Sequence, residues 1–282
     1  MMKWVIRSGF IALWIALLTF FLAAPKEKPA TAARTLNICS WPDAIPESSI
    51  AAFEKEYNVK VNVSYFTTNE ELLTMMRLVD GREYDLVVPS DYAVKILKDE
   101  GLLKRIDKVR IKAFNEIDSF LLGYDYDKNN DYSVPIQWEA LGFGIDTDYF
   151  KNRNEKLSLE LLFAPPKGDY KIAMTNDPVE AINLASFYLF GHTNALTPIE
   201  MDAVTSLLIR QREWIESYNT MRPDYILATK NAPIAFGQSS HLVHANAHSS
   251  FIDFVMPDDA SFLSIESLAL TAATEKDDLA YT

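Results

Sequence analysis

A short polar and aromatic motif that follows a buried strand is the part of this sequence best suited to hold a ligand. An apolar strand is expected at residues 86–88, and Pro89, Ser90, Asp91 and Tyr92 come directly after it. Open α/β folds bind their ligands at the carboxyl ends of the strands, where such residues are presented. The motif therefore predicts a binding site to which Ser90 and Tyr92 contribute.

Three histidines form a second group whose spacing could do chemistry. His241, His244 and His248 are three and then four residues apart, so that a helix would present them on one face. Neutral imidazoles in such an arrangement bind zinc and related ions. No acidic residue stands within this segment of the sequence, and its other residues are typical of an ordinary amphipathic surface. A metal-ion-binding receptor built on these histidines is therefore one hypothesis, which chelator-sensitive thermal stability would test.

The charge of the chain favours cationic ligands. The 282 residues include 27 Lys and Arg and 39 Asp and Glu, which gives a net charge of −12. Five of the positive charges and one of the negative charges precede Thr35, so the rest of the chain carries a net charge of −16. Such a field disfavours nucleic acid and attracts small cations. Many exported proteins are acidic only for solubility, and charge alone does not decide between the two explanations.

The amino terminus is typical of a targeting segment. Lys3 and Arg7 precede an apolar run at residues 10–24, which is short for a membrane span of about 20 residues. The sequence Ala-Thr-Ala at residues 30–32 offers a cleavage site. We expect residues 1–33 to be a signal peptide, with an uncleaved membrane anchor as the alternative. Either way, the rest of the chain is expected outside the cytoplasmic membrane, in the periplasm.

The sequence has no recognisable signature of catalysis or of a cofactor. It contains neither a Gly-rich phosphate loop nor a Ser-His-Asp pattern. Its single cysteine, Cys39, cannot form an intrachain disulfide and is expected to be buried in a strand. The polar segment at residues 125–131 lacks the Gly and the terminal Glu of a calcium loop, so a solvated turn is expected there. We expect no enzyme activity and no cofactor.

Strands and helices alternate along the first half of the chain, which predicts a parallel, layered α/β sheet. Residues 59–66 alternate apolar and polar side chains, as a half-buried strand does. Asn69 is expected to cap the helix that follows, with Leu72, Met76 and Val79 as its buried stripe. In order along the chain, strands are expected at 36–41, 59–66 and 84–89, and helices at 46–57, 70–79 and 92–100.

The second half begins with an extended segment at residues 133–146, which is expected to cross into a second lobe. A long helix is expected at 198–218, with Met201, Val204, Leu208, Ile215 and Tyr218 on one side. The apolar segment at 264–271 is the candidate for a return to the first lobe. The other expected elements are strands at 170–175, 234–236 and 251–256, and a helix at 179–190.

Four ordered blocks resemble a known family: LNICSWPDAIP, YDLVVPSDYAV, DKNNDYSVPIQW and SIESLAL. Together they are similar to the periplasmic spermidine/putrescine-binding proteins of ABC importers, from about Leu36 to the end of the chain. The resemblance implies an α/β fold of the periplasmic-binding-protein type, with two lobes joined by crossover hinge strands. The implied limits are 1–33 for the signal peptide, 34–140 for lobe 1, 141–262 for lobe 2 and 263–282 for the return crossover. The last helices of the family are expected to be missing.

The resemblance also implies a ligand site. Asp177 and Glu180 match the acids that meet an amine from the second lobe, Glu266 stands where the family usually has Asp, and Phe236 where it usually has Trp. The other positions matched are Trp41 and Asp43 after the first strand, and Ser90 and Tyr92 after the third. The implied ligand is a linear polyamine, because carboxylates pair with its ammonium groups and aromatic rings lie against its methylenes.

Several of these residues also have a simpler structural explanation. Asp177 precedes Pro178 and could cap the next helix, and Glu180 would then stabilise the helix dipole. Trp41 and Tyr92 could be ordinary core aromatics. In the crossover, Trp138 is expected to pack at the hinge. Ser264 departs from the family, which typically has a ligand-stacking Trp at this position.

For function, the resemblance implies a solute-binding protein that captures spermidine or putrescine and delivers it to permease subunits in the cytoplasmic membrane. It implies a monomer with a polyamine ligand and no nucleic-acid partner. A polyamine sensor that signals to another protein without transport would have the same ligand site, and it stays open as a further alternative.

Overall fold

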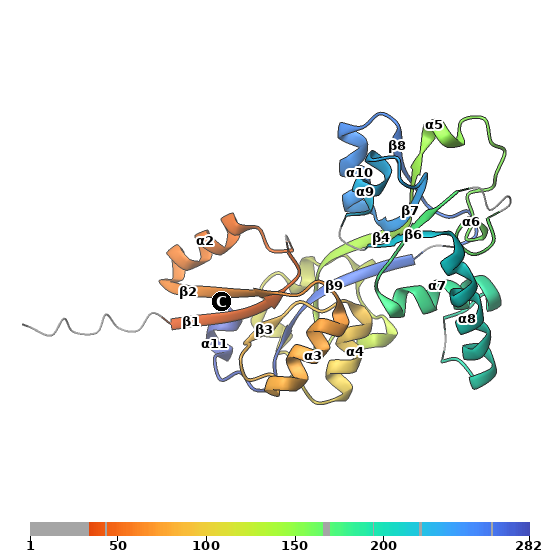
Figure 1. Cartoon of the computed structure of the whole chain (residues 1–282). Coiled ribbons are helices and arrows are strands. Elements are labelled where there is room, and N and C mark those ends of the chain that lie inside the picture. Colours follow the sequence, from red (N-terminus) through yellow and green to blue (C-terminus); the bar gives the residue numbers. More distant parts are fainter. Residues whose placement is uncertain (1–33, 43, 166–169, 194, 220–221, 261) are drawn as a thin grey trace, which may run out of the picture.

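The computed structural model describes residues 34–42, 44–165, 170–193, 195–219, 222–260 and 262–282. It shows two lobes of sheet and helices that two long strands connect (Figure 1). The predicted signal peptide at residues 1–33 lies outside the described residues. Within the described ranges, no helix is both long enough and apolar enough to span a bilayer.

Lobe 1 is built on three parallel strands, β1 (Arg34–Ser40), β2 (Val59–Tyr65) and β3 (Leu86–Val87), with β1 between the other two. Apolar side chains at helical spacing, such as Leu72 and Met76, are fully buried against this sheet together with Cys39, as predicted. The helices of lobe 1 are α2 (Glu47–Tyr57), α3 (Asn69–Val79), α4 (Asp91–Asp99) and α11 (Asp277–Ala280). Four 3-10 turns lead on to lobe 2: η1 (Lys108–Arg110), η2 (Phe114–Glu116), η3 (Ser119–Leu121) and η4 (Asp125–Asp127).

Lobe 2 has its own hydrophobic core, in which Phe143, Phe163 and Ile172 are completely buried. Its strands are β4 (Val134–Asp146), β5 (Ile172–Met174), β6 (Ile215–Tyr218), β7 (Ile234–Gln238) and β8 (Ile252–Val255). Its helices are α5 (Thr147–Phe150), α6 (Glu160–Phe163), α7 (Pro178–Phe190), α8 (Pro198–Gln211), the 3-10 turn η5 (Arg212–Trp214), α9 (Pro223–Ala228) and α10 (Ser239–His248).

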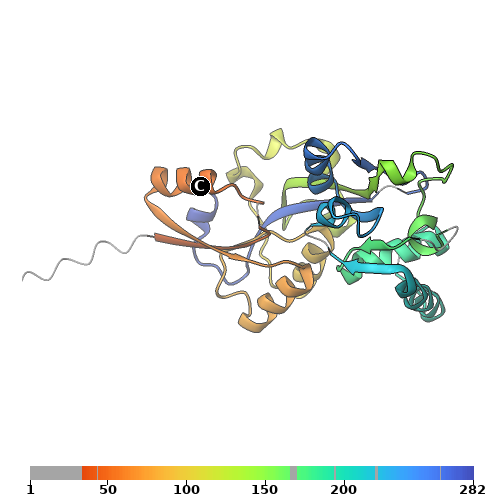
Figure 2. The same ribbon diagram turned by 45° about the horizontal axis from the view of Figure 1, so that its top comes forward.

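The strand β9 (Phe262–Leu270) ties the lobes together. Its last residues pair antiparallel with β3, and its longer part pairs antiparallel with β4. The sheet therefore runs in the order β2-β1-β3-β9-β4-β7-β5-β6, with β8 paired to β4. Figure 2 shows β9 extending from lobe 1 to lobe 2 in a second view. The predicted two-lobed α/β fold with crossover strands is confirmed, although its sheet is mixed rather than purely parallel.

Two sequence-based expectations change in detail. The helix expected at 198–218 ends at Gln211, and residues 215–218 form β6 beside β5. The turn between them is anchored because Gln211 Nε2 and Trp214 Nε1 both donate to the carbonyl of Leu162, at 3.0 and 2.9 Å. Thr68, not Asn69, caps α3 through its side chain. The proposed lobe boundary at residue 140 falls inside β4, and the exact division into domains stays a prediction.

Candidate ligand-binding site

Tyr92 links the two lobes across the candidate site. It lies in the first turn of α4, and its hydroxyl is 2.7 Å from Asp177 Oδ2 of lobe 2 and 3.0 Å from Glu70 Oε1 of α3. A hydroxyl carries one proton, so it donates to only one of these carboxylates at a time. Burial and the neighbouring charge of Asp177 raise the pKa of Tyr92 well above its usual value. The structure therefore brings the predicted site residues Tyr92 and Asp177 into contact.

Asp177 is both a helix cap and a wall of the site. It is 4% exposed, and its Oδ1 accepts hydrogen bonds from the backbone N–H groups of Val179 and Glu180, each at 2.9 Å. Pro178 suits the first position of α7, where no N–H is needed. The other carboxylate oxygen faces Tyr92. Capping thus fixes the orientation of Asp177 and leaves Oδ2 on the side where the lobes meet.

Glu180 and Asp91 bring two more acids to the same place, one from each lobe. Glu180 Oε2 accepts a hydrogen bond from Thr175 Oγ1 at 2.7 Å. Burial, together with the charge of Asp177, raises the pKa of Glu180 to about 8. Burial likewise raises the pKa of Asp91 to about 6, again with a contribution from Asp177. We call Asp91, Asp177 and Glu180 the lobe-interface cluster.

The crossover strands carry a further pair of acids, Glu139 on β4 and Glu266 on β9, which we call the crossover pair. Glu266 is 4% exposed, and its Oε1 accepts a hydrogen bond from Ser264 Oγ at 2.9 Å. Its Oε2 has no hydrogen-bond partner among the described residues. Burial, together with the charges of Glu139 and Asp91, raises the pKa of Glu266 to about 7.

Three cavities that share lining residues run along these carboxylates. The largest, of about 450 Å³, is lined by Trp41, Gln238 and both members of the crossover pair. Trp41 and Gln238 also line a narrow space of about 10 Å³ beside Asp177 and Glu180. A third cavity of about 80 Å³ is bordered by Asp91, Tyr92 and Glu180. The crossover pair and the lobe-interface cluster therefore lie along one row of cavities.

Trp41 and Ser90 line this row, as the sequence predicts for site residues. The ring of Trp41 is held against Phe66, with a centroid distance of 4.5 Å and an interplanar angle of 58°. Its Nε1 is buried and has no hydrogen-bond partner within the described part of the chain. Ser90 is 4% exposed, its N–H donates to Asn69 Oδ1 at 3.2 Å, and its backbone forms a bridge with Glu266. These contacts give both residues fixed positions beside the acids.

Two of the predicted site residues are not found in this arrangement. Phe236 is completely buried in the core of lobe 2, where it packs edge-on against Phe143 at 6.2 Å between ring centroids. The inner part of β7 faces that core, so Gln238 at the end of the strand borders the cavities instead. Asp43 lies outside the described residues. The remaining six predicted residues lie along the row of cavities.

The acids of the site have no lysine or arginine partner in the part of the chain that the structure describes. Among the described residues, no lysine or arginine forms an ion pair with any member of the lobe-interface cluster, the crossover pair or Glu70. Arg222 borders the largest cavity, but Asp224 holds its guanidinium at 2.9 and 3.0 Å. Buried carboxylates without a counter-charge are costly unless they are protonated or meet a cation. The arrangement is therefore suited to a ligand that brings positive charge.

The histidines of α10 do not assemble a metal site. His244 and His248 stack edge-on with ring centroids 4.8 Å apart, and both are exposed. Among the described residues, no group of three or more His, Cys, Asp or Glu side chains is arranged to hold a metal ion. The metal-receptor hypothesis is therefore not favoured.

Sequence reasoning missed several polar residues of the site: Glu70, Asp91, Gln137, Glu139 and Gln238. Asp91 stands between two residues that were predicted, and Glu139 lies next to Trp138 in the crossover. Their positions next to these residues in the sequence could have identified Asp91 and Glu139 as candidates for the site. Glu70 lies in the first turn of a predicted helix, and that position alone explained an acidic residue there. Nothing in the local pattern of residues 137–139 indicated which side chains face the site.

Comparison with known proteins shows which family the chain resembles. The chain matches the family of bacterial extracellular solute-binding proteins over residues 48–282. It is 28% identical over 240 residues to the spermidine/putrescine-binding periplasmic protein of Escherichia coli K12, which is 84% of this chain and 68% of that protein. It is 26% identical over 267 residues to the putrescine/cadaverine-binding protein of Pseudomonas aeruginosa, or 89% of this chain and 74% of the other.

A solved structure shows the same architecture. The putative spermidine/putrescine ABC transporter from Listeria monocytogenes superposes with a TM-score of 0.80 at 25% identity, over 88% of this chain and 76% of that one. The family match covers most of the chain, and the shared fold has two α/β lobes like those described above. This chain belongs to the bacterial extracellular solute-binding proteins.

Proposed function

We propose that this protein captures a linear polyamine between its two lobes and delivers it to an ABC import permease. The observation that carries the proposal is the convergence of buried and half-buried acids from both lobes and the crossover strands, with no lysine or arginine to neutralise them among the described residues. The separated ammonium groups of a polyamine would supply the missing positive charge. Each would donate hydrogen bonds to a carboxylate.

The shape of the site favours a polyamine over other cations. The acids are spread along a row of cavities rather than gathered around one point, which suits several charges on a chain. Trp41 lies between the two groups of acids and borders two of the cavities. Its ring face would attract methylene groups and an adjacent ammonium. A basic amino acid would also bring a carboxylate, which this strongly negative site would repel.

The roles that we assign follow from position. Asp177, Glu180 and Asp91 would pair with one ammonium group, and Glu266 with another. Ser90 and Tyr92 would orient these acids and close the wall beside them. Since Tyr92 and Asp177 come from different lobes, binding at this point would also favour the closed arrangement of the lobes.

The setting of the protein is inferred from its relatives. Proteins named spermidine/putrescine-binding periplasmic proteins are among them, and a solved neighbour is described as an ABC transporter. We therefore place this protein in the periplasm as a monomeric, non-enzymatic receptor, with permease subunits of the cytoplasmic membrane as its partners.

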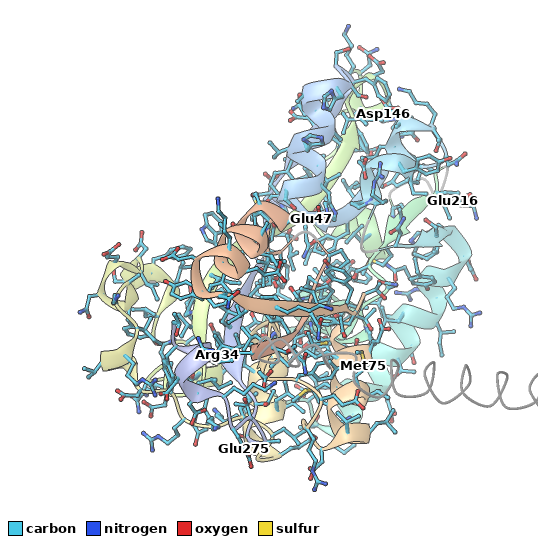
Figure 3. All side chains as sticks on the ribbon, turned by 90° about the vertical axis from the view of Figure 1, so that its left-hand side faces the viewer. Arg34, Glu47, Met75, Asp146, Glu216 and Glu275 are labelled. Atoms are coloured by element: carbon cyan, nitrogen blue, oxygen red, sulfur yellow. The ribbon has the colours of Figure 1, made fainter. Side chains whose placement is uncertain are left out.

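Isothermal titration calorimetry tests the proposal directly. Purified protein should bind putrescine, spermidine or spermine with a stoichiometry of one to one, and free lysine should bind much more weakly. A matched control is Glu216→Gln on β6, an exposed glutamate on lobe 2 that should leave binding unchanged (Figure 3). Folded protein that shows no heat of binding with any of the polyamines would refute the proposed function.

A further inference from the structure

We propose that Glu139, together with Glu266, forms a second ammonium site on the crossover strands, and that this site makes the protein prefer ligands with two ammonium groups over ligands with one. The inference rests on the proposed function, because it concerns how a polyamine is selected. It assigns to Glu139 a role in specificity that its place in the crossover did not suggest.

The pairing of β4 with β9 places the crossover pair on one face of the sheet. Gln137 lies directly opposite Glu266, and Glu139 lies directly opposite Ser264. Residues that are opposite one another, or two apart on a strand, share a face. Each acid is held by the polar neighbour on its own strand: Gln137 Nε2 donates to Glu139 Oε1 at 3.0 Å, and Ser264 Oγ donates to Glu266 Oε1 at 2.9 Å. The result is a rigid, four-residue polar patch with two diagonal carboxylates.

This patch faces the largest cavity of the site. Both acids line the space of about 450 Å³, and they are only 5% and 4% exposed. Arg222 is the only lysine or arginine among the described residues that line it, and Asp224 already holds its guanidinium. Glu266 Oε2 has no hydrogen-bond partner among the described residues, which leaves one strong acceptor available. Two buried acids, one open acceptor and an adjoining cavity together point to a cation as the missing component.

Glu139 also has a structural task, but that task does not require its charge. Its Oε2 accepts hydrogen bonds from the backbone N–H of Ser240 at 3.0 Å and from Ser239 Oγ at 3.2 Å, at the start of α10. Its partners among the described residues are all neutral. A glutamine carbonyl oxygen could accept from Ser240 and Ser239, and the glutamine NH2 group could donate to the side-chain oxygen of Gln137 if that amide turns over. A buried negative charge diagonal to another acid raises the energy of the empty protein. The charge is therefore better explained by a ligand than by the support of α10.

The experiment compares two ligands with the same four-carbon chain, putrescine and butylamine, on the wild-type protein and on Glu139→Gln. Wild-type protein should bind putrescine more tightly than butylamine, and Glu139→Gln should reduce this preference by about tenfold or more, because a buried ammonium loses one charged partner. Glu139→Asp keeps the charge and should retain much of the preference. Glu216→Gln serves as the control for a lost surface charge.

Purely structural damage would weaken the binding of putrescine and of butylamine equally. The ratio of the two affinities therefore separates a structural role of Glu139 from a role in recognising the second ammonium group. An unchanged ratio in folded Glu139→Gln would overturn the inference while leaving the proposed function intact. Absence of polyamine binding by the wild-type protein would instead remove the proposed function. If the variants do not fold, a crystal structure of the wild-type protein with putrescine decides: a ligand nitrogen within hydrogen-bond distance of Glu139 supports the site, and a ligand that leaves Glu139 untouched overturns it.

Discussion

Polyamine binding should release protons, because the acids that receive the ammonium groups are partly protonated in the empty protein. Burial raises the pKa of Glu180 to about 8, that of Glu266 to about 7 and that of Asp91 to about 6. With these pKa values, the three carboxyl groups together hold about 1.5 protons at pH 7. A nearby ammonium favours the ionised form of each acid. Binding at pH 7 should therefore expel roughly one to two protons per ligand.

The affinity should rise with pH as a consequence. Each proton released per ligand corresponds to about a tenfold increase in the association constant per pH unit. Between pH 6 and pH 8 the same three groups lose most of their protons, so the association constant should increase by roughly two to three orders of magnitude. Above about pH 9 the acids are already ionised in the empty protein, and the dependence should flatten.

Calorimetric titrations at pH 7 in phosphate and in Tris measure the released protons, because the two buffers take up protons with different enthalpies. The apparent binding enthalpy should differ between them by the number of protons times the difference in ionisation enthalpy. Glu180→Gln removes the group with the highest pKa of the three and should lower the number of protons by about 0.9. A binding enthalpy that is independent of the buffer, with equal affinity at pH 6 and pH 8, would refute the reasoning.

Further predictions concern stability and individual side chains. The folded protein raises the pKa values of Asp91, Glu180 and Glu266, so their contribution to the free energy of unfolding is fully present below their unfolded-state pKa values, near 4, and is lost as pH rises through 6 to 8. Thermal melts of the unliganded protein should therefore show a lower Tm at pH 9 than at pH 5. A higher Tm at pH 9 would contradict this. Asp177→Ala should weaken polyamine binding by about 2–5 kcal/mol in calorimetry and lower the free energy of unfolding by about 1 kcal/mol through the lost cap of α7; a loss of stability without a loss of affinity would leave only the capping role. Trp41→Ala should cost about 1–3 kcal/mol of binding, and an unchanged affinity would show that its ring does not contact the ligand. Tyr92→Phe removes the hydroxyl that contacts Asp177 and should loosen the contact between the lobes, seen as faster hydrogen exchange at the start of α7; unchanged exchange would show that this hydroxyl does not hold the lobes together.

The motif after β3 could be interpreted from the sequence because the relevant physics is local. A short apolar strand followed by small polar and aromatic residues leads straight into α4, and the carboxyl edge of a sheet is where such residues collect. Most strands and helices followed from periodicity in the same way. The long crossover segments were visible as extended chain, and the structure places them as β4 and β9 between the lobes.

Other features depend on contacts between distant segments and left no local trace. The helix after Pro198 ends at Gln211 because Leu162, about fifty residues away, binds the turn that follows. Phe236 was assigned to the ligand by correspondence with the family, but its position within β7 directs it into the core of lobe 2. Asp127 was expected in a solvated turn. It is instead buried, and its carboxylate accepts hydrogen bonds from the backbone N–H groups of Asp131, Tyr132 and Ser133.

The lack of cationic partners for the acids of the site, among the described residues, also could not be predicted from the sequence. Composition showed an excess of acids, but it could not show which acids are buried or that no lysine or arginine among the described residues pairs with them in the site. That property depends on two lobes and two crossover strands meeting at one place. It appears only once Asp177, at the N-cap of α7, and Glu266, on β9, are seen beside the same row of cavities.

The central claim is that buried carboxylates without a cationic partner select a ligand for its ammonium groups. The most direct test is a calorimetric comparison of putrescine with 1,4-butanediol, which has the same four-carbon chain but hydroxyl groups in place of the ammonium groups. The account predicts one-to-one binding of putrescine and no measurable binding of the diol. Equal affinity for the two compounds, or binding of the diol alone, would contradict it.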